Sequence, residues 1–239
     1  MRVLALDTTT RAGSVAIVDE DETVDERPGD AARTHAERLP RDIIALLEAH
    51  RLTVSAIDLF AVASGPGSFT GLRIGIATMQ GLALVARRGL VGVSALDALA
   101  HVASGNAATG TIVAAWMDAH RRDVFTALYR VLDAPLFDPD RLKELDAPAV
   151  GDPAATLRRW RESFGHVPAL IAGDGAATFS DVLARDAPTS RVVAPSAIAA
   201  AVGRIARARA RRGEAVDPAA IQPLYVRRPD AELAREHAR

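Results

Sequence analysis

The most distinctive stretch of the chain reads Gly65-Pro66-Gly67-Ser68-Phe69-Thr70-Gly71-Leu72-Arg73-Ile74-Gly75. It follows the apolar run Leu59 to Ala63, which predicts a buried strand, and it opens a helical pattern over Thr70 to Ala86. Ser68 or Thr70 is placed to cap that helix. Three of its glycines fall four residues apart, which clears one helix face for close approach of another backbone. Pro66 has no amide proton and no Walker-type lysine is present, so the stretch is not a P-loop.

The composition limits what the rest of the chain can do. The 239 residues are 49% hydrophobic and 25% charged, which is enough for a buried core and excludes wholesale disorder. The formal charge of −1 argues against a dedicated nucleic-acid-binding protein. No cysteine is present, which excludes disulfide scaffolds, thiolate zinc sites, Fe–S clusters and cysteine nucleophiles.

Strand and helix patterns repeat in two halves. Three short runs, 3–6, 14–18 and 23–26, predict an antiparallel meander, and 111–116 and 124–130 predict a second set of strands. The segment 104–110 is small, polar and flanked by glycine, as in a linker. We therefore expect an α/β or α+β chain with an amino-terminal lobe over 1–103 and a carboxy-terminal lobe over 104–239. The stretch 133–148 is interrupted by proline and is expected to be irregular.

Two further helices carry specific expectations. Thr34 to Glu37 has the spacing of a capping box, and apolar residues recur at helical spacing after it, although Pro40 predicts a kink or a later start. The helix over 70–86 is apolar on all sides, so we expect it to be buried in its own domain or covered by another chain. A long Ala/Arg helix over 196–212 is expected to pack back on the first lobe.

Two short turns are candidates for binding phosphate. Asp7-Thr8-Thr9-Thr10 lies between two predicted strands, and Gly173-Asp174-Gly175 follows another strand. Hydroxyls and free amides in such turns can surround phosphate oxygens. Both patterns are also typical of ordinary structural turns, and the first contains little glycine.

Neither the histidines nor the arginines define a site. The six histidines are scattered and contain no His-x-x-x-His pair, so no metal ligand set is assigned. Arg204, Arg207 and Arg211 share one face of the last long helix and can contact RNA phosphates. The same positions suit cations that complement the dipole at a helix carboxyl end, and we favour that interpretation.

No membrane segment is expected. The amino terminus reaches Asp7 after a strand-length apolar run, which is too short for a secretory signal. No stretch has the roughly 20 apolar residues that span a bilayer. These features predict a soluble, cytoplasmic chain.

Several of these segments together resemble the bacterial TsaB (YeaZ) family over nearly the whole chain. The similarity covers 4–16, 35–40, the glycine-rich stretch 65–75, 117–125, 173–176 and 223–227. It implies the two-lobed actin/Hsp70/sugar-kinase (ASKHA) fold, with a repeated strand–helix plan. Residues 133–148 and the tail beyond 228 are poorly covered.

The resemblance also implies a function. Members take part in installing the threonylcarbamoyl group on adenosine 37 of ANN-decoding tRNAs. The implied role is a non-catalytic subunit without a cofactor that binds and activates the catalytic subunit TsaD and is joined by the ATPase TsaE. tRNA would then be contacted only through the complex. The catalytic relative carries a metal-binding His-x-x-x-His, and the matching positions here are Ala95 and Leu99, which cannot coordinate a metal.

By the same resemblance, two helices pair with equivalent helices of the partner in a four-helix bundle, or with a second copy when the chain is alone. The expected interface residues are Leu39, Ile43, Leu46, Leu47, Gly71, Leu72, Gly75, Ile76 and Met79. Vestigial nucleotide-binding positions would be Asp7, Thr8, Thr9, Gly173, Asp174 and Gly175. The alternative is an ATP-dependent small-molecule kinase of the same superfamily, with Asp7, Thr9 and the 173–175 turn around the phosphates.

Overall fold

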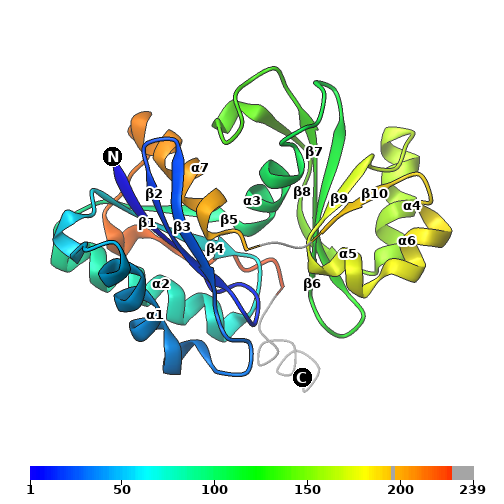
Figure 1. The fold of residues 1–239 in the computed structure, drawn as a ribbon. Helices are drawn as coiled ribbons and strands as arrows, with labels where there is room; N and C mark the ends of the chain where they lie inside the picture. The colour runs from blue at the N-terminus through cyan, green and yellow to red at the C-terminus, as the bar shows by residue number, and fades with distance from the viewer. Residues whose placement is uncertain (195–196, 228–239) are drawn as a thin grey trace.

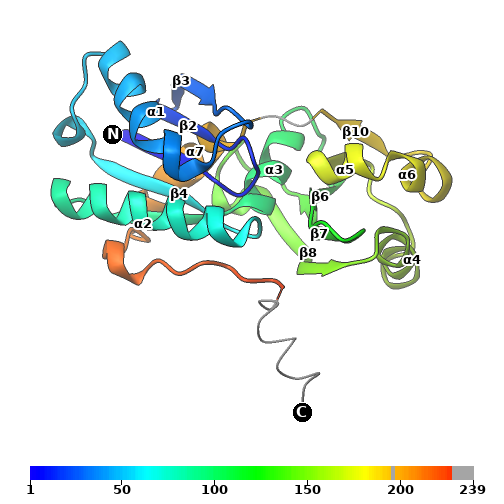
Figure 2. The ribbon, with the colours of Figure 1, turned by 90° about the horizontal axis from the view of Figure 1, so that it is seen from below.

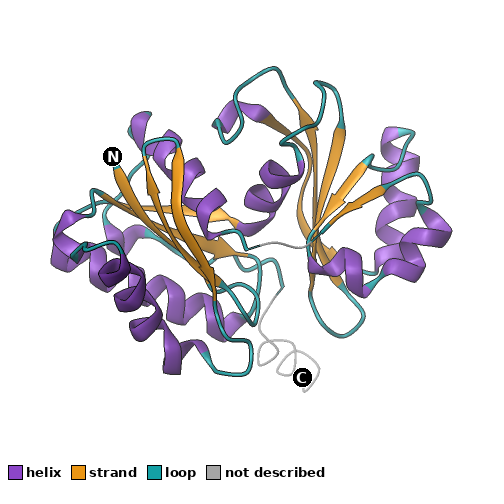
Figure 3. Ribbon diagram, viewed as in Figure 1, coloured by secondary structure: helices purple, strands orange, loops and turns teal. Residues whose placement is uncertain are grey.

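The computed structural model describes residues 1–194 and 197–227 and has two lobes, each built on a five-stranded sheet (Figure 1). Strands of the first sheet come from residues 2–28 and 59–94, and those of the second from residues 112–193. Helices cover both sheets, as the colouring by secondary structure makes plain (Figure 3). The two-lobed α/β architecture is therefore confirmed.

The first sheet has the order β3-β2-β1-β4-β5. The expected meander is formed by β1 (Arg2–Asp7), β2 (Ser14–Asp19) and β3 (Glu22–Pro28), which pair antiparallel. β4 (Leu59–Gly65) and β5 (Leu90–Ser94) extend the sheet in parallel. The short helix η1 (Val54–Ala56) precedes β4.

Helices cover both faces of the first sheet. α1 (His35–Ala49) and α2 (Phe69–Ala86) lie on one face, and α7 (Ala199–Arg211) lies on the other (Figure 1). Although α7 is late in the chain, it contacts β1, β2, β4 and β5. Its first amides are satisfied by the first lobe, because the amide of Ala199 donates to Ser14 Oγ and that of Ala200 to Glu26 Oε1.

The second sheet has the order β10-β9-β6-β7-β8. Its strands are β6 (Ile112–Asp118), β7 (Val124–Val131), β8 (Leu142–Gly151), β9 (Leu170–Ala172) and β10 (Arg191–Val193). The helices of this half are α4 (Pro153–Phe164), α5 (Asp174–Thr178) and α6 (Ser180–Asp186). Two short 3-10 helices are η2 (Pro139–Arg141) before β8 and η3 (Pro218–Ala220) near the carboxyl end.

One hydrophobic core joins the two lobes. α3 (Ala95–Ala103) contacts β4 and β5 of the first sheet and β6, β7 and β9 of the second, and it also packs on α7. The buried side chains of α3 and α7 form one cluster with residues of both sheets. The lobes thus meet along a continuous apolar contact between the sheets.

The structure corrects several sequence-based expectations. Residues 133–148 are not irregular throughout, because β8 pairs antiparallel with β7 as an edge strand, where Pro148 is tolerated. α6 and β10 were not expected. α1 begins at His35, with Thr34 and Glu37 forming the capping box, and runs through Pro40. The expected start of the last long helix at Ser196 lies outside the described residues, and the helix is described from Ala199.

α2 is not buried on all sides. In the described part of the chain it is the one helix long and apolar enough to meet the limits of a membrane span, yet only a third of it is buried. Leu84 and Val85 are 69% and 80% exposed. A helix that packs one apolar face on the sheet and exposes apolar residues on the other has the same sequence pattern as a helix buried on all sides.

The glycines of the 65–75 stretch allow the turn between β1 and β2 to lie directly on α2. A Cβ added at Gly71 would stand 2.2 Å from the carbonyl oxygen of Thr8, and one at Gly75 would stand 2.1 Å from Thr8 Oγ1. At Gly67, with φ +159°, a Cβ would approach Thr9 to 2.6 Å. The backbone approach expected from the glycine spacing is therefore confirmed, and the approaching segment is the Asp7–Gly13 turn.

We predict that Gly71→Ala destabilises the fold by about 2 kcal/mol or more, because the new Cβ meets backbone that cannot move aside. Gly81→Ala is the matched control in the same helix, since a Cβ there meets nothing within 4 Å. The control should be neutral or stabilise by about 0.5–1 kcal/mol. Urea unfolding at one pH measures both, and equal stabilities of the two variants would contradict the close-packing account.

Candidate functional site: the interlobe cleft and the outer helix faces

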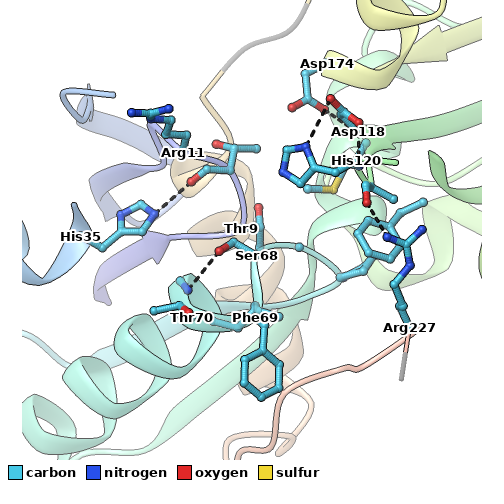
Figure 4. Close-up of a pocket in the computed structure, with 18 of the residues that line it drawn as sticks. Thr9, Arg11, His35, Ser68, Phe69, Thr70, Asp118, His120, Asp174 and Arg227 are labelled. Atoms are coloured by element: carbon cyan, nitrogen blue, oxygen red, sulfur yellow. Dashed lines mark hydrogen bonds and ion pairs between the residues drawn. The ribbon is translucent and has the colours of Figure 1, made fainter. Parts of the chain in front are cut away.

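A cleft of about 990 Å³ lies between the lobes. Its walls come from the Thr9–Arg11 turn, the start of α1, the Pro66–Leu72 segment, the turn between β6 and β7, and residues 224–227. Figure 4 shows Thr9, Ser68 and Thr70 from the first lobe facing Asp118, His120 and Asp174 from the second. A second, smaller cavity of about 410 Å³ reaches Asp7 and Asp174. The cleft therefore unites the two candidate phosphate turns.

The polar groups of Thr9 in the first turn are already bonded within the chain. The amide and Oγ1 of Thr9 both donate to Asp7 Oδ1, at 2.8 and 2.6 Å. The amide of Ser68 donates to the carbonyl of Thr9 at 2.9 Å. Asp7, Thr8 and Thr9 are each at most 3% exposed. Phosphate would need free donors at this position, and Thr9 offers none. Thr8 Oγ1 has no hydrogen-bond partner, but it is buried against Gly75 of α2.

The first turn of α1 holds the same turn from its other side. His35 Nε2 lies 3.0 Å from the carbonyl oxygen of Thr10, and Arg38 donates to the carbonyl of Ala12. Arg38 is itself buried and pairs with Asp42 at 2.6 Å. Burial lowers the pKa of His35, and the neighbouring Arg38 charge lowers it further. The 35–40 motif is thus explained as a clamp on the turn.

The second candidate turn packs as closely as the first. Gly173 has φ +117°, and a Cβ on it would stand 2.0 Å from the carbonyl oxygen of Trp116 in β6. A Cβ on Gly175 would meet Met117 and Trp116 at 3.0 Å. Asp174 Oδ1 accepts a hydrogen bond from the amide of Asp118 at 3.0 Å. These glycines are needed for packing of the turn on the strand.

Carboxylates lie in both cavities: Asp118 and Asp174 line the cleft, and Asp7 and Asp174 line the smaller cavity. Burial raises the pKa of Asp7 to about 6, and the charges of Asp174 and Glu26 contribute in the same direction. The pKa of Asp174 is also raised, first by burial and then by the charge of Asp118. Arg11, Arg33, Arg121 and Arg227 also line the cleft, so its walls carry charges of both signs. Among residues 1–194 and 197–227, no group of three or more potential ligands is arranged to hold a metal ion.

The positions that match the metal histidines of the catalytic relative lie in the core. Ala95 and Leu99 are buried in α3, within the cluster that joins the lobes. Their side chains have no atom that binds a metal. Both side chains serve packing at this position.

The arginines of α7 are engaged by carboxylates and rings of the same chain. Arg207 pairs with Glu20 and Asp21, and Arg209 with Asp97. Arg211 pairs with Glu20, and Arg212, directly after α7, pairs with Asp138 and Asp140. The guanidinium of Arg204 lies over the ring of Phe137. These contacts favour a structural role over the alternative of direct RNA binding.

The residues expected at a helix interface are buried inside the chain. Leu39, Ile43, Leu46, Leu47, Gly71, Leu72, Gly75, Ile76 and Met79 all lie in the interior, most of them in the core between α1, α2 and the sheet. These side chains are covered within the chain itself, and their contact with a partner stays a prediction. Apolar residues at helical spacing first cover the chain's own sheet, and only positions rotated away from that face can reach another protein.

Sequence reasoning missed the apolar residues that do face outward. Ile44 of α1 is 54% exposed, and Leu84 and Val85 form an exposed pair near the end of α2. Ala77, Gly81 and Leu84 lie on the exposed side of α2 at spacings of four and three, opposite the buried Leu72, Ile76, Met79 and Ala83. A helical projection separates the two faces, but it does not say which of them covers the sheet.

A family model, a sequence relative and a solved structure match this chain. The family model for TsaD, tRNA N6-adenosine threonylcarbamoyltransferase, matches residues 24–235. The TsaB protein of Escherichia coli is 40% identical over 131 residues, or 54% of this chain and 55% of that protein. The structure of YeaZ from Pseudomonas aeruginosa superposes with a TM-score of 0.72 at 30% identity, covering 94% of this chain and 99% of that one. The chain thus spans about half the length of the Escherichia coli relative in that match.

The class of protein is defined by the fold. A component of the (R)-2-hydroxyglutaryl-CoA dehydratase of Acidaminococcus fermentans shares it with a TM-score of 0.53 at 12% identity, over 88% of this chain and 99% of that one. This is the two-lobed ASKHA architecture. Within it, the chain belongs to the TsaB (YeaZ) group of the tRNA N6-adenosine threonylcarbamoyltransferase family.

We predict that Asp7→Asn stabilises the chain at neutral pH. An acid whose folded pKa is about 6, above its ordinary 3.8, contributes stability at low pH that is lost as the pH rises from about 4 to 6. The rise of the Asp7 pKa from 3.8 to about 6 corresponds to a loss of about 3 kcal/mol of folding stability at most. Asparagine avoids this loss and can still accept the hydrogen bonds from Thr9.

Urea unfolding between pH 4 and 7.5 measures this effect. The gain from Asp7→Asn should be largest at pH 7.5 and close to zero at pH 4. Asp133→Asn, on the exposed surface, is the control and should show no such pH dependence. A variant less stable than the parent at pH 7.5 would show instead that the ionised carboxylate supports the fold.

Proposed function

We propose that this chain takes part in the biosynthesis of tRNA threonylcarbamoyladenosine, as a subunit with no catalytic residue of its own. Two relatives that carry the TsaB or YeaZ name support the pathway. Support for the non-catalytic role comes from the residues themselves. Ala95 and Leu99, which the resemblance matches to metal-binding histidines, are apolar and buried. Both donors of Thr9 are bonded to Asp7.

The proposed partner is a TsaD-like catalytic subunit, bound along the outer faces of α1 and α2. The observation that carries this proposal is the exposed apolar pair Leu84 and Val85, with Ile44 exposed on α1. On the exposed side of α2, Gly81 has open space at its Cβ position, although alanine would favour the helix. A glycine that the chain's own packing does not require allows a second helix to approach closely.

The remaining partners follow from the same proposal. A TsaE-like ATPase joins the complex, and tRNA is contacted through the assembly. A second copy of the chain covers the same helix faces when the catalytic subunit is absent, because a bare apolar surface is unfavourable in water. The cytoplasm, where tRNA is modified, remains the predicted location.

The kinase alternative makes a different prediction for the isolated chain. Micromolar binding of Mg-ATP in calorimetry, abolished by Asp7→Ala, would favour a kinase. We expect no such binding, because the Asp7 carboxylate and both donors of Thr9 are bonded to each other.

We predict that Leu84→Arg and Val85→Arg each weaken binding to the TsaD-like subunit at least about tenfold, or about 1.4 kcal/mol, because a charge replaces an apolar contact. Isothermal titration against the TsaD-like subunit from the same source measures the change. Val192→Arg is the control, since Val192 is an exposed apolar residue of β10 in the second lobe. Unchanged affinity in both α2 variants would rule out this face as the interface.

A further inference from the structure

The chain segment after α7 runs along the first lobe and ends against the second (Figure 2). Val216 pairs with β5, with hydrogen bonds of 3.1 Å in both directions. Gln80 of α2 donates to two carbonyls of the segment, at 2.9 and 3.2 Å. The amide of Leu224 then donates to the carbonyl of Ser64 in β4 at 2.7 Å. The segment is thus fixed to the first lobe at several points.

Tyr225, the residue after Leu224, is fixed to the first turn of α2. The ring of Tyr225 stacks on that of Phe69, with centroids 5.2 Å apart. Arg73 Nε donates to the hydroxyl of Tyr225 at 3.0 Å, and the Arg73 guanidinium lies 4.0 Å from the Phe69 ring centroid. The aromatic contact holds the chain at the edge of the cleft.

Arg227 then crosses to the second lobe. Its Nη1 donates to the carbonyl of Ala119 at 2.6 Å, as Figure 4 shows, and its Nη2 forms an ion pair with Asp123. The guanidinium also lies 5.9 Å from the ring centroid of Phe125. All three contacts belong to the turn between β6 and β7 or the start of β7. One side chain therefore ties the segment to the opposite wall of the cleft.

The receiving turn is well defined. The amide of Ala119 donates to the carbonyl of Asp123 at 3.1 Å, and the amide of Asp123 donates to the carbonyl of His120 at 3.0 Å. His120, Arg121 and Arg122 all have φ between +55° and +67°. Three successive residues in the left-handed region make a tight turn, which presents a carbonyl and a carboxylate to Arg227 at fixed positions.

We propose that residues 221–227 form an interlobe latch, with Arg227 as its attachment to the second lobe, and that the latch holds the cleft at its observed opening. The lobes also meet through α3 and α7, which pack between the two sheets. Rotation of the lobes about that contact moves the β6–β7 turn relative to α2. Arg227 opposes this rotation because it is bonded to the turn while Leu224 and Tyr225 are bonded to the first lobe.

The absence of cysteine makes the distance between the lobes measurable. Glu48→Cys on α1 and Glu162→Cys on α4 are exposed positions in different lobes, and spin labels on them report the interlobe distance by pulsed electron paramagnetic resonance. We expect one narrow distribution for the labelled parent chain. Arg227→Ala should add a second population or broaden the distribution, since both polar contacts of the latch to the second lobe are removed.

Control and rescue variants make the test specific. Arg185→Ala removes an arginine–aspartate pair within α6, at 2.8 Å, and should leave the distribution unchanged. The exchange Arg227→Asp with Asp123→Arg should narrow the distribution again, because the ion pair is rebuilt with reversed charges. Tyr225→Ala frees the middle of the latch and should act like Arg227→Ala.

Thermal unfolding checks that each labelled variant is folded. An Arg227→Ala distribution that matches the parent overturns the latch. An equal change in Arg185→Ala overturns it as well, because the effect would then not depend on contact between the lobes.

Discussion

The close packing of the Asp7–Gly13 turn on the glycine face of α2 is the constraint on which the rest of the first lobe depends. The carbonyl of Thr8 and the side chains of Thr8 and Thr9 occupy the space that side chains at positions 67, 71 and 75 would need. His35 and Arg38 secure the turn from the side of α1. Three separate motifs of the sequence thus serve one contact, and that contact sets how α1 and α2 lie on the sheet.

This packing also changes what the cleft can do. A turn between two strands at the mouth of a two-lobed fold is well placed to hold phosphate, but here the donors of Thr9 bond to Asp7 and its carbonyl accepts from Ser68. Carboxylates and arginines both line the cleft. The outer faces of α1 and α2 retain exposed apolar residues, among them Ile44, Leu84 and Val85.

The two lobes are held together in two ways. α3 and α7 place a continuous apolar core between the sheets, and Ala95 and Leu99 belong to it. The polar contacts of Arg227 join the lobes at the cleft itself. The first contact is broad and non-directional, and the second depends on a single side chain, so the two respond differently to substitution.

Local patterns were sufficient to predict much of this molecule. The antiparallel meander, the capping box at Thr34, the cap at Ser68 and the glycine face of α2 are all short-range features, because alternation, capping and backbone clearance depend on neighbours along the chain. β8 was missed because proline normally indicates a break in a strand, whereas an edge strand tolerates Pro148.

Contacts between distant residues could not be predicted. Leu72 and Leu84 are both leucines of α2, yet Leu72 is buried and Leu84 is exposed. The position of the sheet decides which face of the helix is covered. Likewise, only the family resemblance distinguishes residues 223–227 in the sequence. The role of this segment across the cleft depends on the contact of Arg227 with a turn more than 100 residues earlier in the chain.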